Sequence, residues 1–264
     1  MELETLVSKA QNGDKDALEG VVQAIQDDVH HLAMRMLVNP DDALDAVQDI
    51  LILVITKLST FSGRSAFKTW VYRVSFNYLL NAKKSLARDP GLSFDGFEQD
   101  LADGLGEKRI EDPVLLNELR VSCTMAMLLC LDRAHRAAYI VGFILEIAHD
   151  EAAEILAISK TNYRQRLSRA RQKVNAFTQR ACGLVNSGAA CSCPRRLPAA
   201  MAVGRIQEGQ TFFGGGDAAA YAAVLRRTKR LESGLRTLTL QQATRRFASP
   251  RDFAAVIGEL VDTP

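Results

Sequence analysis

Apolar residues recur at three- and four-residue spacing along most of this chain, and nowhere do they alternate like a half-buried strand. The clearest stripe consists of Ala43, Val47, Ile50, Leu51, Val54 and Leu58. This spacing places the six side chains on one face of an amphipathic helix. Because no segment shows the two-residue period of a strand, we predict an all-α protein.

The helical pattern breaks once in the middle of the chain. Residues 89–113 contain prolines, glycines and many acids without a sustained period, and we interpret them as a flexible acidic linker. The linker separates a helical domain at 1–88 from a second at 114–178, and a helical C-terminal extension occupies 179–264. A length of 264 residues suits two small domains better than one core.

The charges nearly cancel, since 33 Lys and Arg oppose 31 Asp and Glu for a formal net charge of +2. A total says nothing about distribution. The segment 160–173 contains six basic residues and no acid, whereas 89–113 is acidic. The near-zero sum therefore conceals surfaces of opposite sign and does not argue against nucleic acid as a partner.

A short helix at 150–157, a turn around 158–160 and a basic helix from Thr161 to about Phe177 have the outline of a helix-turn-helix. The first turns of such a recognition helix meet base edges in the major groove, and later basic residues neutralise phosphates. The alternative for an isolated basic helix is a solvated cationic face. The predicted DNA contacts are Asn162, Arg164, Gln165 and Arg166, followed by Arg169 and Lys173 as phosphate contacts.

Two motif blocks resemble the bacterial extracytoplasmic-function (ECF) sigma factors. Asn39-Pro-Asp-Asp-Ala-Leu-Asp-Ala-Val-Gln-Asp-Ile50 and Phe61-Ser-Gly-Arg-Ser-Ala-Phe-Lys-Thr-Trp70 are similar to region 2 of that family. Asp150-Glu-Ala-Ala-Glu-Ile-Leu-Ala-Ile-Ser159 and the basic helix are similar to region 4, although Tyr163 stands where a smaller aliphatic residue is usual. The resemblance implies a region 2 helical bundle and a region 4 helix-turn-helix, which binds the −35 promoter element.

The resemblance also implies roles for region 2. Asp45, Gln48 and Asp49 occupy the positions that bind core RNA polymerase, although such residues can equally form a solvated helix face. The loop Ser59–Ser65 resembles the loop that captures an unstacked base of the −10 element, where a glycine lets backbone approach the base. The implied −10 contacts are Ser62, Gly63, Arg64, Lys68, Tyr72, Arg73 and Asn77. Trp70 has the spacing of a core residue.

The function implied is that of an ECF RNA polymerase sigma factor, which directs promoter recognition and transcription initiation. Its partners would be core RNA polymerase and promoter DNA, and it would be a cytoplasmic protein that is not an enzyme, requires no cofactor and contacts no membrane. The alternative is a metal- or thiol-responsive helix-turn-helix regulator that acts without polymerase. A region 2 block distinguishes the two, because such a regulator does not need it.

Three clustered cysteines in the extension, Cys182, Cys191 and Cys193, could bind Zn²⁺ or another soft metal, or could be structural thiols. A closed zinc site needs four ligands, and His135 or His149 would have to supply the fourth. Cys123 and Cys130 lie in apolar helical patterns, which favours buried positions. The tail around Arg245–Pro250 resembles extensions of a subset of the family. The protein could be regulated by a separate anti-sigma factor, or this tail could regulate it intramolecularly in place of one.

Overall fold

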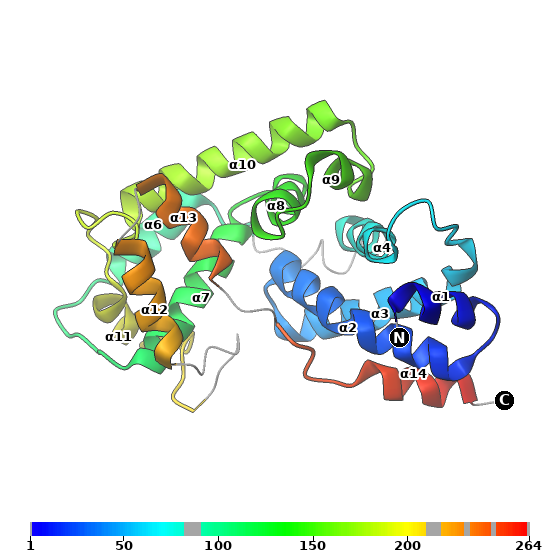
Figure 1. Cartoon of the computed structure of the whole chain (residues 1–264). Helices are drawn as coiled ribbons and strands as arrows, with labels where there is room; N and C mark the ends of the chain where they lie inside the picture. Colours follow the sequence, from blue (N-terminus) through cyan, green and yellow to red (C-terminus); the bar gives the residue numbers. More distant parts are fainter. Residues whose placement is uncertain (1, 82–90, 210–217, 230–232, 244–246, 263–264) are drawn as a thin grey trace. The chain divides into compact units, whose positions relative to one another are not determined.

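The computed structural model describes residues 2–81, 91–209, 218–229, 233–243 and 247–262, and these contain helices and no β-strand (Figure 1). This confirms the predicted all-α class. The helices are α1 (Leu3–Gln11), α2 (Lys15–Leu37), α3 (Pro40–Thr56), α4 (Phe67–Asn81), α6 (Phe94–Asp103), α7 (Pro113–Leu129), α8 (Arg133–Tyr139), α9 (His149–Ile155), α10 (Lys160–Ala181), α11 (Cys193–Ala202), α12 (Ala218–Lys229), α13 (Ser233–Gln242) and α14 (Phe253–Asp262). A 3-10 turn, η1 (Leu58–Thr60), and a π-helical turn, η2 (Ile140–Ile144), complete the set.

The chain forms two compact units. The first unit comprises residues 1–89, 148–163 and 246–264, and the second comprises 90–147 and 164–245. This division by contacts differs from the boundaries drawn on the sequence, because α9 and the start of α10 belong to the first unit. None of the helices in the described ranges is both long and apolar enough to cross a membrane.

In the first unit, α2 packs against α1, α3, α4 and α14. Val22 and Val29 of α2 and Val47 of α3 are fully buried, as the apolar stripes predict. The cap of α3 is Asn39, whose side chain accepts a hydrogen bond of 3.0 Å from the Asp42 amide. Asn39 precedes the helix in extended conformation, and Pro40 fills the first helical position, where no amide partner is needed.

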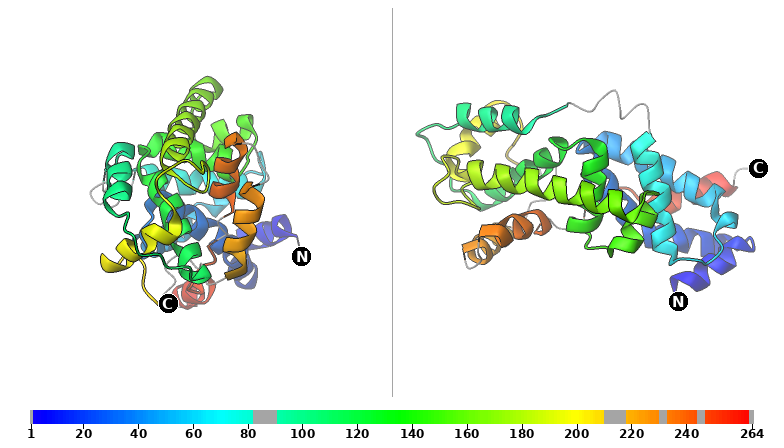
Figure 2. Two further views of the ribbon diagram at one scale, coloured as in Figure 1. Left: turned by 90° about the vertical axis from the view of Figure 1, so that its left-hand side faces the viewer. Right: turned by 90° about the horizontal axis from the view of Figure 1, so that it is seen from above.

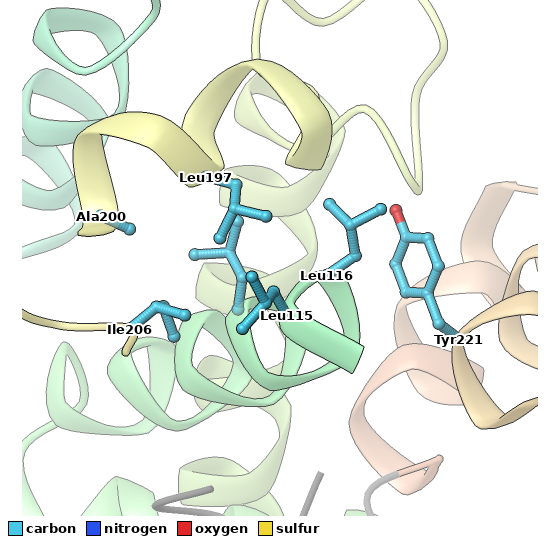
Figure 3. Packing of buried hydrophobic residues seen from close by; sticks show 7 residues of the cluster. Leu115, Leu116, Leu197, Ala200, Ile206 and Tyr221 are labelled. Carbon is cyan, nitrogen blue, oxygen red and sulfur yellow. The ribbon is translucent and has the colours of Figure 1, made fainter. Parts of the chain in front are cut away.

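In the second unit, α11 and α12 pack on α7. Figure 3 shows Leu197 of α11 and Tyr221 of α12 near Leu116 of α7, within a buried cluster. The cluster consists of Leu115, Leu116, Leu119, Leu197, Ala200, Ile206 and Tyr221. The first part of the C-terminal extension is therefore a structural component of the unit that contains α7.

The expected linker at 89–113 is not irregular throughout. Its described part contains α6, which begins after Ser93, whose hydroxyl accepts a hydrogen bond from the Gly96 amide. Phe97 and Leu101 are buried, and the ring of Phe97 stacks on Phe177 of α10 at 5.2 Å. The apolar positions of this short helix were obscured by surrounding acids and a glycine. Its acids face cations: Asp100 pairs with Arg196 and Arg205, and Glu98 pairs with Arg180.

The described part of the C-terminal extension contains α11, α12, α13 and α14, as expected of a helical extension. The extension is divided between the units, because α11–α13 belong to the second and the segment from 247 onward to the first. Figure 1 shows α14, in red, beside α2, in blue.

Candidate nucleic-acid interface

Helix α10 is the long yellow-green helix in Figure 2. All six residues predicted to contact the −35 element lie within its bounds. Its apolar positions form one buried stripe: Tyr163, Leu167, Ala170, Val174 and Phe177. The predicted contact residues lie off this stripe, and all are exposed except Arg166, which is half-buried. The helix therefore presents a basic face without a single acidic residue, as groove and phosphate binding requires.

The turn before α10 is short and well fixed. The Ser159 hydroxyl accepts a hydrogen bond of 3.2 Å from the Asn162 amide, which places Asn162 and Arg164 in the first helical turns. Ala157 adopts a left-handed φ of 52°, where the chain reverses between α9 and α10. The Tyr163 ring is fully buried, 5.5 Å from the ring of His149 on α9, and burial raises the pKa of Tyr163 to about 12. The large residue at position 163 thus fills the helix-turn-helix interior.

Two other cations of α10 have partners. Lys160 forms an ion pair with Asp150 of α9. The guanidinium of Arg171 lies 5.1 Å from the centre of the Phe143 ring, a cation–π contact. These contacts orient the helix, and neither residue is among the predicted DNA contacts.

The loop between α3 and α4 holds Ser62, Gly63 and Arg64 exposed. Gly63 has a φ of 70°, a conformation that favours glycine, and no other atom lies within 4 Å of where its Cβ would be. The base of this loop is fixed, because Phe61 packs on Phe67 and Trp70, with ring centres 5.2 and 5.6 Å away. This contact confirms that Trp70 packs in an aromatic cluster, while the loop tip is left open.

On α4, two of the predicted −10 contacts form ion pairs. Lys68 lies 2.8 Å from Asp28 of α2, and Arg73 lies 2.5 Å from Glu154 of α9. Arg73 and Glu154 are both more than a third exposed, so their pair contributes at most about 1 kcal/mol, whereas Asp28, the partner of Lys68, is only 6% exposed. Tyr72 is half-buried and Asn77 is exposed.

On α3, the predicted polymerase-binding residues share one polar face. Asp45 and Asp49 are exposed and Gln48 is half-buried. The carboxylate of Asp49 accepts a hydrogen bond from the Tyr78 hydroxyl of α4. Burial, together with this carboxylate, raises the pKa of Tyr78. Asp49 is therefore held in place by α4, whereas Asp45 projects from the same face.

The three clustered cysteines lie near one another in the second unit, at the end of α10 and the start of α11. Burial raises the pKa of Cys182, that of Cys191 to about 11 and that of Cys193 to about 12, so the free thiols are neutral at pH 7. Across the described residues, no group of three or more His, Cys, Asp or Glu side chains is already arranged as a metal site.

A fourth cysteine, which the sequence pattern did not place here, lies beside these three. Cys123 of α7 lines the same cavity as Cys182, Cys191 and Cys193. Cys123 is far along the chain from the other three cysteines, so no local sequence pattern indicates that it lies beside them. The packing of α11 on α7 brings it there. Cys123 also packs against a hydrophobic cluster, as its apolar sequence pattern predicts.

Comparisons with known proteins agree with the motif blocks. The Sigma-70 region 2 family matches residues 21–89. The chain is 28% identical over 184 residues to the ECF RNA polymerase sigma factor SigW of Bacillus subtilis, covering 65% of this chain and 94% of SigW. It is 29% identical over 180 residues to the ECF RNA polymerase sigma-E factor of Escherichia coli K12, covering 67% of this chain and 94% of that protein. A solved structure of CnrH in complex with the cytosolic domain of CnrY is 20% identical, with a TM-score of 0.49 over 66% of this chain and 96% of that one.

Proposed function

We propose that this chain is an ECF sigma factor, which binds core RNA polymerase through the polar face of α3 and promoter DNA through the loop before α4, α4 itself and α10. The observation that carries this proposal is an exposed, acid-free basic face on α10 in the same chain as a region 2 block. A helix-turn-helix regulator that works without polymerase needs a basic recognition helix, but it does not need a region 2 block.

We assign region 2 to residues 1–88, a connecting segment to 89–113, region 4 to 114–178 and an extension to 179–264. Sigma factors are not enzymes and need no cofactor, and we propose the same of promoter recognition by this chain, in the cytoplasm where polymerase acts. Metal binding by the three clustered cysteines would then serve the extension and not the binding of promoter DNA.

Within α10, we assign base contacts to the first turns and phosphate contacts to the later ones. Asn162, Arg164 and Gln165 lie nearest the turn, where the end of a recognition helix enters the major groove. Arg169 and Lys173 lie further along the exposed face, at a position suited to the DNA backbone.

Arg164→Ala is expected to weaken binding to the −35 element by about 1–3 kcal/mol in a base-dependent way, because arginine pairs bidentately with guanine. Binding of polymerase holoenzyme to a panel of −35 variants measures this. Lys173→Ala is the matched comparison: as a phosphate contact it should weaken all promoters about equally and reduce the salt slope by about 1. An equal loss on every promoter for Arg164→Ala would make it a phosphate contact instead.

Asp45→Ala is expected to weaken binding to core polymerase by at least about tenfold, or about 1.4 kcal/mol, because an exposed carboxylate facing a basic partner helix would be lost. Fluorescence anisotropy of labelled protein with core polymerase measures the affinity. Glu19→Ala removes an equally exposed helical acid from α2 and should change nothing. Equal affinities for the two variants would place the polymerase contact elsewhere.

In vitro transcription with purified core polymerase tests the function as a whole. The full chain should bind core and start transcripts from a cognate promoter selected from random sequences. Binding to DNA by the protein alone, without any binding to core, would favour the alternative of an independent regulator.

A further inference from the structure

Four of the five cysteines of this chain surround one cavity in the second unit. Cys123 comes from α7, Cys182 follows α10, Cys191 lies in the next loop, and Cys193 begins α11. The rest of the lining is largely apolar, including the rings of Phe97 and Phe177. The fifth cysteine, Cys130, does not line the cavity; its thiol donates a hydrogen bond to the Ala126 carbonyl.

The backbone after Cys182 turns tightly. The amides of Val185 and Asn186 donate hydrogen bonds to the Cys182 carbonyl at 3.0 and 2.9 Å. The backbones of Cys182 and Cys191 pair as an isolated β-bridge, and their thiols are free. In this pairing the Gly183 amide donates a hydrogen bond to the Cys191 carbonyl at 3.0 Å. A Cβ on residue 183 would lie 2.3 Å from that oxygen, so the bridge requires glycine. This backbone pairing holds Cys182 and Cys191 next to each other.

A buried cation lines the same cavity. The guanidinium of Arg120, which is 2% exposed, donates through Nε and Nη2 to the side chain of Asn117, and its Nη1 has no hydrogen-bond partner. Burying a guanidinium nitrogen without a partner is costly. Negative charge on the neighbouring sulfurs of Cys123 and Cys193 would compensate it.

We propose that Cys123, Cys182, Cys191 and Cys193 together bind one Zn²⁺ ion as four thiolates. Zinc displaces one proton from each thiol, and four protons leave to solvent. The resulting site has a formal charge of −2, which faces the charge of Arg120. The sulfurs must draw together to about 2.3 Å from the metal, because the described residues do not already hold them in a metal-site arrangement.

This site would fasten the extension to α7, because one ligand comes from α7 and three follow α10. With Cys123 as the fourth ligand, the site needs no histidine from the helix-turn-helix. It is independent of the proposed promoter contacts, since none of its four residues lies on the exposed face of α10.

The test uses the full chain, purified without oxidation and reconstituted with Zn²⁺ or Co²⁺. Elemental analysis is expected to find one zinc per chain, and the cobalt form should show tetrahedral d–d bands with strong thiolate-to-cobalt charge transfer. Cys123→Ser should lower zinc affinity by at least about 100-fold. Loss of a residue that only hydrogen-bonds to a metal ligand already costs about 10–100-fold, and loss of a ligand should cost more. Its cobalt charge-transfer band should fall by about a quarter, as three of four sulfurs remain.

Two further variants keep this test decisive if Cys123→Ser folds poorly. Cys130→Ser removes the cysteine outside the cavity and should retain full zinc affinity and the four-sulfur cobalt spectrum. Cys123→His restores a ligand and should recover binding with a shifted cobalt spectrum. The proposal is overturned if the reconstituted wild-type chain binds no zinc, if it binds iron instead, or if Cys123→Ser and Cys130→Ser have the same affinity and spectrum.

Discussion

Phe177→Ala is expected to lower the free energy of unfolding of the second unit by about 3–5 kcal/mol. Phe177 is 1% exposed, and its ring contacts both aromatic residues of α6, at 5.2 Å from Phe97 and 5.3 Å from Phe94. Truncation to alanine leaves a cavity between two helices that only partly collapses. Urea unfolding followed by circular dichroism measures the change in midpoint.

The exposed neighbour Gln172 gives the control for this experiment. Gln172→Ala keeps the same helix and should change stability by less than about 0.5 kcal/mol. If Phe177→Ala lost less than about 1 kcal/mol, α6 would not be a fixed part of the second unit. The segment 91–112 would then behave as the irregular linker expected from its composition.

The helix α6, in the segment expected to be an irregular linker, shows which kind of helix the sequence does not predict. Long stripes, as in α3 and α10, predict helices well, because many positions repeat the same period. In α6 only Phe94, Phe97 and Leu101 carry the period, and they acquire a partner only when Phe177 is brought to them. A short helix that depends on a distant ring has little local signal.

In the candidate sites, too, features with a local sequence pattern could be predicted, and contacts between distant helices could not. The exposed positions of α10 could be predicted, since they are what remains beside a buried stripe. Cys123 could not be predicted as a neighbour of Cys193, because it faces that residue only through the packing of α11 on α7. The pairing of Lys68 with Asp28 is likewise a contact between helices and has no pattern in the sequence.

The C-terminal segment is anchored to α2 by an interaction that the sequence also did not predict. Adjacent histidines hold the backbone of Phe247: its carbonyl lies 3.2 Å from His30 Nδ1, and its amide donates to His31 Nδ1 at 2.9 Å. Two further amides of the segment, those of Ser249 and Phe253, donate to Asp27 and Gln26 of α2. Apolar contact follows, because Phe253 and Ile257 of α14 are buried.

This docking favours an uncharged His30. Burial lowers the pKa of His30, although the Phe247 carbonyl and Asp27 act in the opposite direction. A charge on the His30 ring therefore opposes the folded first unit with the segment bound.

Lowering the pH below about 6.5 is expected to destabilise the first unit and release the segment from residue 247 onward. The unfolded chain binds the His30 proton more readily than the folded chain, so stability is complete above the unfolded pKa and is lost as the pH falls toward the folded one. The slope that His30 contributes is at most about 1.4 kcal/mol per pH unit. Thermal unfolding of the full chain between pH 7.5 and 5 measures it. His30→Gln, which keeps a donor for the Phe247 carbonyl without a titrating group, should flatten the slope. A chain ending at residue 246 should show the same flattening, and a slope that survives this truncation would assign the pH dependence to groups outside the contact with α2.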